Sequence, residues 1–145
     1  MTPCLADLNF LLSVVVRTHP HHGVALAWYR KQAAGRIGVC RVVQLGLIRL
    51  LGNTYIMRDQ ALSARAAWDV AAELIADERV EFWPEPLGLD DFLPRLLRYP
   101  GPTPSLVADA YLAAFAMVRR AAVVTFDAGF RQFEGLPLEL LTSNS

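Results

Sequence analysis

Short apolar segments alternate with longer helical stretches along this chain, and that alternation limits the fold more than any other feature. The short segments read as strands at 3–6, 36–39, 80–83, 122–125 and 138–141. The helical stretches are 9–16, 21–34, 42–51 (largely buried), 59–77, 89–98 and 104 to about 120, the last with Thr103 as N-cap. Strands separated by helices favour a parallel sheet covered on both faces. The sequence therefore predicts an α/β fold.

The chain is expected to form a single domain over residues 1–145, because neither a linker nor a repeat interrupts it. Its apolar fraction of 54% predicts a well-filled core and a surface that pairs with another chain. No apolar run is long enough to cross a membrane, and the N-terminal run lacks the features of a signal peptide. With Cys4 and Cys40 read as buried, reduced thiols, we expect a cytoplasmic protein.

Three aspartates lie in unusually apolar surroundings. Asp7 follows the first predicted strand, Asp127 follows the strand at 122–125, and Asp109 lies near the start of the last long helix. Burying a carboxylate costs several kcal/mol unless hydrogen bonds, a cation or a metal compensate it. Because ligands gather beyond the carboxyl ends of strands in open α/β sheets, we expect the three to meet there.

Each aspartate also has a structural interpretation. Asp7 could cap the helix that follows it, and Asp127 could form an Asx turn with Gly129. Asp109 could face solvent on a narrow polar stripe of its helix. Three separate structural roles explain the pattern less simply than one shared site does, so the sequence favours a shared site. Carboxylate oxygens suit Mg²⁺ or Mn²⁺, which can activate water and stabilise charge on a phosphodiester.

Six segments in order resemble the PIN-domain ribonucleases, and in particular the VapC-type toxins of toxin–antitoxin pairs. They are residues 5–12, 19–28, 43–50, 82–84, 108–114 and 125–130, and they cover nearly the whole chain. The resemblance implies a Rossmann-like three-layer α/β/α sandwich with a mostly parallel sheet. It also implies RNA hydrolysis with Mg²⁺ or Mn²⁺, an RNA substrate, a VapB-type antitoxin and a homodimer.

The resemblance assigns roles to individual residues. Asp7, Asp109 and Asp127 match the acidic, metal-binding positions of the family, and Asn9 and Thr125 match neighbouring polar positions that orient ligands or water. The usual fourth acid of the family falls nearest Gln44. A glutamine offers a carbonyl oxygen but no charge, so this departure puts metal affinity and catalytic strength in question.

Several other groups have both a functional and a structural interpretation. Arg49, about one and a half turns beyond Gln44, could contact phosphate or could be a surface arginine. The histidines at 19, 21 and 22 are expected to be structural, because Pro20 breaks helical ligand spacing. Net charge is zero, so RNA would need a local basic patch, whereas dispersed arginines are the simpler interpretation. The three tryptophans are expected to be core or interface anchors.

Two other α/β classes use aspartates at strand ends. Receiver domains and haloacid-dehalogenase phosphatases both need a late lysine, and the single lysine, Lys31, comes early. The leading hypothesis is therefore a metal-dependent endoribonuclease toxin acting on transfer or ribosomal RNA, which would leave a 5′-phosphate and a 3′-hydroxyl. The alternative is a catalytically weakened PIN module that acts mainly as an antitoxin-binding or co-repressor component.

Overall fold

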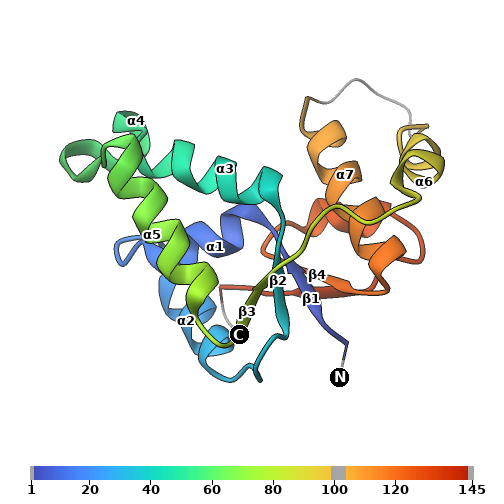
Figure 1. The fold of residues 1–145 in the computed structure, drawn as a ribbon, viewed down its shortest axis with the longest axis horizontal. Helices are drawn as coiled ribbons and strands as arrows, with labels where there is room; N and C mark the ends of the chain where they lie inside the picture. The colour runs from blue at the N-terminus through green and yellow to red at the C-terminus, as the bar shows by residue number, and fades with distance from the viewer. Residues whose placement is uncertain (1, 99–103, 144–145) are drawn as a thin grey trace.

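The computed structural model describes residues 2–98 and 104–143, and a five-stranded parallel sheet lies at its centre (Figure 1). The strands run in the order β3-β2-β1-β4-β5. All four neighbouring pairs are parallel, and β1 contacts β4 through the register Ala6 to Val124. The strand bounds are β1 Cys4–Ala6, β2 Ile37–Val39, β3 Val80–Phe82, β4 Ala122–Thr125 and β5 Leu138–Leu140.

Helices cover the sheet on both sides. Figure 1 shows α1, α2, α3 and α5 on one side and α6 and α7 on the other. The helix bounds are α1 Leu8–Val15, α2 His22–Arg30, α3 Arg41–Leu51, α4 Thr54–Met57, α5 Ala64–Ala76, α6 Leu89–Leu96 and α7 Pro104–Arg119, with short 3₁₀ turns at Arg58–Gln60 and Ala128–Gln132. Among the described residues, no helix combines the length and apolar character needed to cross a bilayer.

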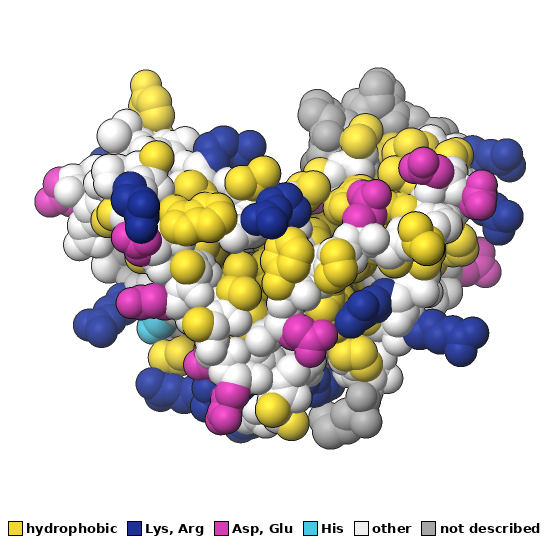
Figure 2. Space-filling model, viewed as in Figure 1, with side chains coloured by type: hydrophobic (Ala, Val, Ile, Leu, Met, Phe, Trp, Pro, Cys, Tyr) yellow, Lys and Arg dark blue, Asp and Glu magenta, His cyan; other side chains and the backbone are white. Residues whose placement is uncertain are grey.

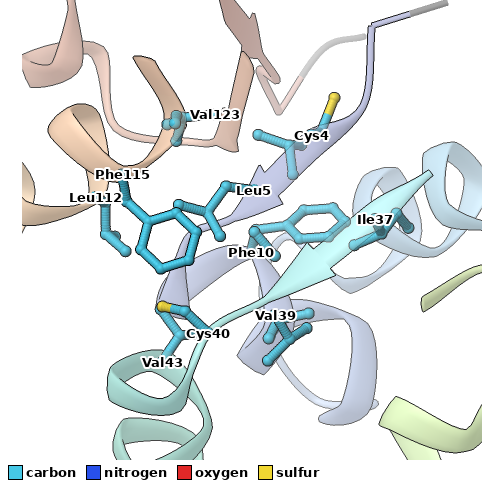
Figure 3. Packing of buried hydrophobic residues seen from close by; sticks show 14 of the residues in the cluster. Cys4, Leu5, Phe10, Ile37, Val39, Cys40, Val43, Leu112, Phe115 and Val123 are labelled. Atoms are coloured by element: carbon cyan, nitrogen blue, oxygen red, sulfur yellow. The ribbon is translucent and has the colours of Figure 1, made fainter. Parts of the chain in front are cut away.

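The core forms where the central strands meet the two helical layers. Figure 3 shows buried side chains of α1, α7, β1 and β2 gathered there, among them Phe10 and Phe115. At the β3 edge, the indole of Trp83 covers Gly38 and is only 2% exposed. A Cβ atom at Gly38 would lie 2.1 Å from that ring, so the close packing requires glycine.

The α/β class, the parallel sheet and all five strands are confirmed. The single helix expected over 59–77 is wrong: a separate helix, α5, begins at Ala64, because the Ser63 hydroxyl accepts a hydrogen bond from the Ala66 N–H and starts it there.

Two other helices differ from the predictions, and one predicted cap is not described. The helix expected over 21–34 ends at Arg30, four residues early, and the Gln32 side-chain amide donates to the Trp28 carbonyl at its end. The helix at 42–51 exposes one face, with Val42 51% exposed. Thr103, the predicted N-cap of α7, lies outside the described residues.

Candidate active site

Asp7 sits at the junction between β1 and α1. Its Oδ1 accepts a hydrogen bond from the Leu8 N–H at 2.8 Å, so it does cap α1. Its Oδ2 accepts a second bond, at 2.7 Å, from the Thr125 hydroxyl. The residue is only 8% exposed. Capping alone does not explain such burial, because an exposed aspartate caps a helix equally well.

Thr125 connects two of the three predicted aspartates. It is the last residue of β4, which pairs with β1, and it is fully buried. Its hydroxyl donates to Asp7 and accepts from the backbone N–H of Asp127 at 2.9 Å. One side chain therefore fixes the Asp7 carboxylate and the backbone that presents Asp127.

Asp127 is exposed and begins the turn after β4. Its Oδ1 accepts a hydrogen bond from the Gly129 N–H at 2.8 Å, which is the predicted Asx turn. The structural interpretations of Asp7 and Asp127 are thus both correct. These hydrogen bonds still leave each carboxylate able to bind a cation, because each carboxylate oxygen can accept two hydrogen bonds.

Asp109 lies on α7, on the side of the sheet opposite to α1. It is half-buried and, together with Asp7 and Asn9, lines a cleft of about 320 Å³. The walls come from α1, α3 and α7, and they are apolar at Leu8, Val42, Val43, Gly46, Ala108 and Leu112. Figure 2 shows this face of the molecule hollowed between the half that carries α3 and the half that carries α7.

The three carboxylates interact electrostatically. Burial raises the pKa of Asp7 above its usual value, and the nearby charge of Asp127 adds to that effect, while the bonds from Thr125 and Leu8 oppose it. Burial also raises the pKa of Asp109 to about 6, with further contributions from Asp7 and Asp127. A positive charge placed between the three carboxylates would relieve this mutual repulsion.

The donor set fits a divalent cation in its chemistry. Asp7, Asp109 and Asp127 supply hard carboxylate oxygens, and Asn9 can add an amide oxygen from the same cleft. However, within residues 2–98 and 104–143, no three Asp, Glu, His or Cys side chains stand close enough to hold a metal together as they are placed. Asp127 also lies outside the lining of the cleft, so the three predicted ligands converge on one region without forming a closed cage.

Gln44 does not line the cleft. It is 5% exposed, and its Oε1 accepts a hydrogen bond from the guanidinium of Arg41, which stacks on Phe82. Two residues along a helix correspond to a rotation of about 200°, so Gln44 points away from its neighbours Val42 and Gly46, which do line the cleft. The structure therefore places Gln44 in a hydrogen bond with Arg41, outside the lining of the cleft.

The α3 side chain that enters the cleft with a charge is Arg49. It is exposed, and no carboxylate in the described part of the chain forms an ion pair with it. Sequence reasoning overlooked Gly46, whose lack of a side chain lets Leu8 approach: a Cβ there would lie 2.8 Å from Leu8 Cδ2. A glycine inside a helical run is the signal that could have revealed this close approach.

The predicted structural role of the histidines is supported by their contacts. His22 Nδ1 lies 2.8 Å from the Ser13 carbonyl oxygen, and His19 Nδ1 accepts a hydrogen bond from the His21 N–H. The first contact joins α1 to the start of α2, and the second lies within the connection between them. Burial lowers the pKa of His19, and the neighbouring histidines lower it further.

Comparison with known proteins shows the family. The sequence profile of the PIN domain matches residues 4–136. The chain belongs to the PIN-domain family. This PIN domain is 35% identical over 142 residues to ribonuclease VapC41 of Mycobacterium tuberculosis, covering 94% of this chain and 97% of the relative. Ribonuclease VapC37 of the same organism is 34% identical over 134 residues, covering 91% and 92%.

Solved structures share the fold at lower identity. VapC20 of Mycobacterium tuberculosis, described as a sarcin–ricin loop cleaving toxin, superposes with a TM-score of 0.68 at 18% identity, over 89% of this PIN domain and 93% of that chain. DNA-bound VapBC from Salmonella typhimurium gives 0.66 at 17% identity, over 96% and 98%. The predicted PIN-like, Rossmann-type sandwich is thereby confirmed.

Proposed function

We propose that this PIN domain is a metal-dependent endoribonuclease, the toxin of a toxin–antitoxin pair. The observation that carries the proposal is the carboxylate set at the cleft: Asp7 and Asp109 line it, burial raises the pKa of both, and Asp127 is tied to Asp7 through Thr125. The names of its relatives, ribonucleases at up to 35% identity over most of the chain, support RNA as the substrate.

In this proposal Asp7, Asp109 and Asp127 hold Mg²⁺ or Mn²⁺, with Asn9 as a further oxygen donor. A bound cation would offset the negative charge of the site and of a phosphodiester, and would make a water molecule more acidic. Thr125 orients Asp7 and favours its ionised form by donating to its Oδ2.

Arg49 is the cleft cation that can contact a phosphate of the RNA backbone, because it is exposed and unpaired within the described part of the chain. The apolar walls of the cleft keep its dielectric low, which strengthens the contact of Arg49 with phosphate and that of the carboxylates with the cation. The chain's own residues therefore supply binding, orientation and a charged site, and the RNA strand lies between α3 and α7.

An antitoxin partner is supported by the solved VapBC complexes that share the fold and by apolar side chains left exposed around the cleft. These are Val42 on α3, which lines the cleft, and Val107 on α7, which adjoins the lining residue Ala108. A VapB-type antitoxin segment that covers them would also close the cleft against RNA. A homodimer and a cytoplasmic location complete the proposal.

The decisive experiment is cleavage of structured transfer and ribosomal RNA by the purified chain with Mg²⁺, with Mn²⁺ and with excess EDTA. Asp7→Asn and Asp109→Asn should abolish metal-dependent cleavage. Asp69→Asn, an exposed acid on α5 paired with Arg65, is the matched control and should cleave normally. Equal rates for all three variants would refute the assignment.

The alternative, a weakened PIN module that works mainly by binding its antitoxin, draws on one observation: α3 brings an arginine to the cleft, and Gln44 is engaged elsewhere. Calorimetric titration with Mn²⁺ separates the two. Metal binding together with RNA cleavage supports the nuclease, whereas an antitoxin-binding chain that neither binds Mn²⁺ nor cleaves RNA would support the alternative.

A further inference from the structure

A second cavity lies beside the carboxylate site. It has a volume of about 350 Å³ and is formed where β4 and β5 end. Its principal walls are Phe126, Ala128 and Arg131 after β4, Leu141 and Ser143 after β5, and His21 from the α1–α2 connection. Phe126 stands between Thr125 and Asp127 in the chain, so this pocket and the carboxylate site are built on one segment.

The aromatic wall of the pocket is held in place. The His21 ring lies almost parallel to Phe126, with 4.4 Å between centroids and 11° between planes. His21 Nδ1 also lies 3.1 Å from the Ser143 hydroxyl. These contacts join three segments that are distant in sequence, and none of the roles assigned to the carboxylates requires them.

The pocket also contains a free positive charge. Arg131 is exposed, and within residues 2–98 and 104–143 no acidic side chain forms an ion pair with it. By contrast, Arg36, Arg79 and Arg119 each have a carboxylate partner. A free guanidinium next to a hydroxyl and an imidazole is suited to a phosphate group.

The remaining surface of the pocket is apolar. Leu141 is buried, and Leu140 and Phe126 are half-buried beside it. A nucleotide combines the two properties that this pocket presents, since its phosphate is anionic and its base has a flat apolar face. Ala128, Arg131 and Ser143 are exposed, so the pocket is open along one side, as a strand that continues past it requires.

We propose that this pocket binds a nucleotide of the RNA strand that flanks the scissile phosphodiester, with Arg131 on its phosphate and its base against Phe126 and Leu141. The proposal rests on the ribonuclease function proposed above and adds a substrate subsite to it. Arg131 and Phe126 would then determine how firmly the strand is held, while the carboxylates determine whether it is cut.

Binding tests the pocket without cleavage. The probe is a fluorescein-labelled single-stranded RNA of ten nucleotides, titrated in EDTA and followed by anisotropy. Arg131→Ala should weaken binding about 10-fold and flatten the dependence of log Kd on log salt by about 0.7, the value for one lost phosphate contact on a single strand. Arg131→Lys should recover part of the affinity, because it keeps the charge.

Two matched variants control for side effects. Arg65→Ala removes an exposed arginine on α5 and should bind the RNA as the unmodified protein does. Phe126→Leu removes the ring but keeps an apolar side chain, and it should weaken binding about 3- to 10-fold with little change in salt dependence. Circular dichroism melts of each variant check that the fold is kept.

A small substrate separates the pocket from the cutting site. Bis(p-nitrophenyl) phosphate carries a phosphodiester but no neighbouring nucleotide, so Arg131→Ala should hydrolyse it at the unmodified rate while kcat/KM on RNA falls about 10-fold. Equal losses on both substrates, or RNA binding by Arg131→Ala equal to that of Arg65→Ala, would overturn the proposal. If the unmodified protein cleaves neither substrate, the ribonuclease function fails, and the anisotropy titration still decides the subsite.

Discussion

The hydroxyl of Thr125 offers the sharpest test of how the carboxylate site is built. Thr125→Val preserves the shape of this fully buried residue but removes both of its polar contacts. The bond donated to the Asp7 carboxylate is worth about 1.5–3 kcal/mol, and the bond accepted from the Asp127 N–H about 0.5–1.5 kcal/mol. At pH 7.5 the free energy of unfolding should therefore fall by about 2–4 kcal/mol.

The loss should depend on pH. Burial raises the pKa of Asp7 in the folded protein, so ionisation of this group opposes folding as the pH rises through that pKa. The Thr125 hydroxyl lowers the same pKa, and removing it extends the destabilisation to higher pH. Lowering the pH toward 4 favours the protonated carboxyl group, whose bond to Thr125 is an ordinary neutral one, so the cost should shrink toward about 1–2 kcal/mol.

Urea unfolding followed by circular dichroism at pH 4 and pH 7.5 measures both numbers. Thr125→Ser is the matched variant, because it keeps the hydroxyl and loses only a buried methyl group, at a cost of about 1 kcal/mol at either pH. The reasoning is refuted if the valine variant loses the same free energy at both pH values, or if serine is as damaging as valine.

Three further outcomes follow from the same geometry. Because the pKa of Asp109 is raised to about 6, Asp109→Asn should stabilise the protein by about 1–2 kcal/mol at pH 8, after allowance for solvent screening, with no gain at pH 4 in urea unfolding. Mn²⁺ in large excess should raise the Tm of the unmodified protein by several degrees in a thermal melt, whereas Asp7→Asn should show no such rise. Gly38→Ala should cost about 3 kcal/mol, because its Cβ would lie 2.1 Å from the Trp83 ring, and Trp83→Leu in the same chain should recover part of that loss in denaturant titrations.

The strands were predictable from the sequence because of where they lie. Strands covered on both faces read as short continuous apolar runs, and β4 at Ala122–Thr125 is such a run, buried at every position. Helix starts were less predictable, because caps compete with periodicity. The apolar spacing at Leu62 continued the pattern of α5 backwards, but the hydroxyl of Ser63 starts the helix at Ala64. Asn53 similarly caps α4, accepting from the Tyr55 and Ile56 N–H groups, in a segment where no helix was expected.

The candidate site was predictable in its residues but not in its connections. The apolar surroundings of Asp7 and Asp109 marked both as unusual, and both line the cleft. The bond from Thr125 to Asp7 depends on β1 and β4 being neighbours, and strand order cannot be read from periodicity. Gln44 and Arg49, which both lie on α3, show a similar limit to what the sequence predicts. A motif fixes which residues are near in sequence, whereas helical phase decides which one faces the cleft.

The capping roles of Asp7 and Asp127 and their proposed catalytic roles depend on one another. Each Oδ1 accepts a hydrogen bond from a backbone N–H at 2.8 Å, so neither carboxylate rotates freely. The conformational entropy of these side chains is therefore already lost on folding. Binding a cation does not require that loss a second time. A capping aspartate at a strand end thus makes a better ligand than an unrestrained one. Asp109 accepts no such backbone bond among the described residues, and its half-burial on α7, with the charges of Asp7 and Asp127, raises its pKa to about 6.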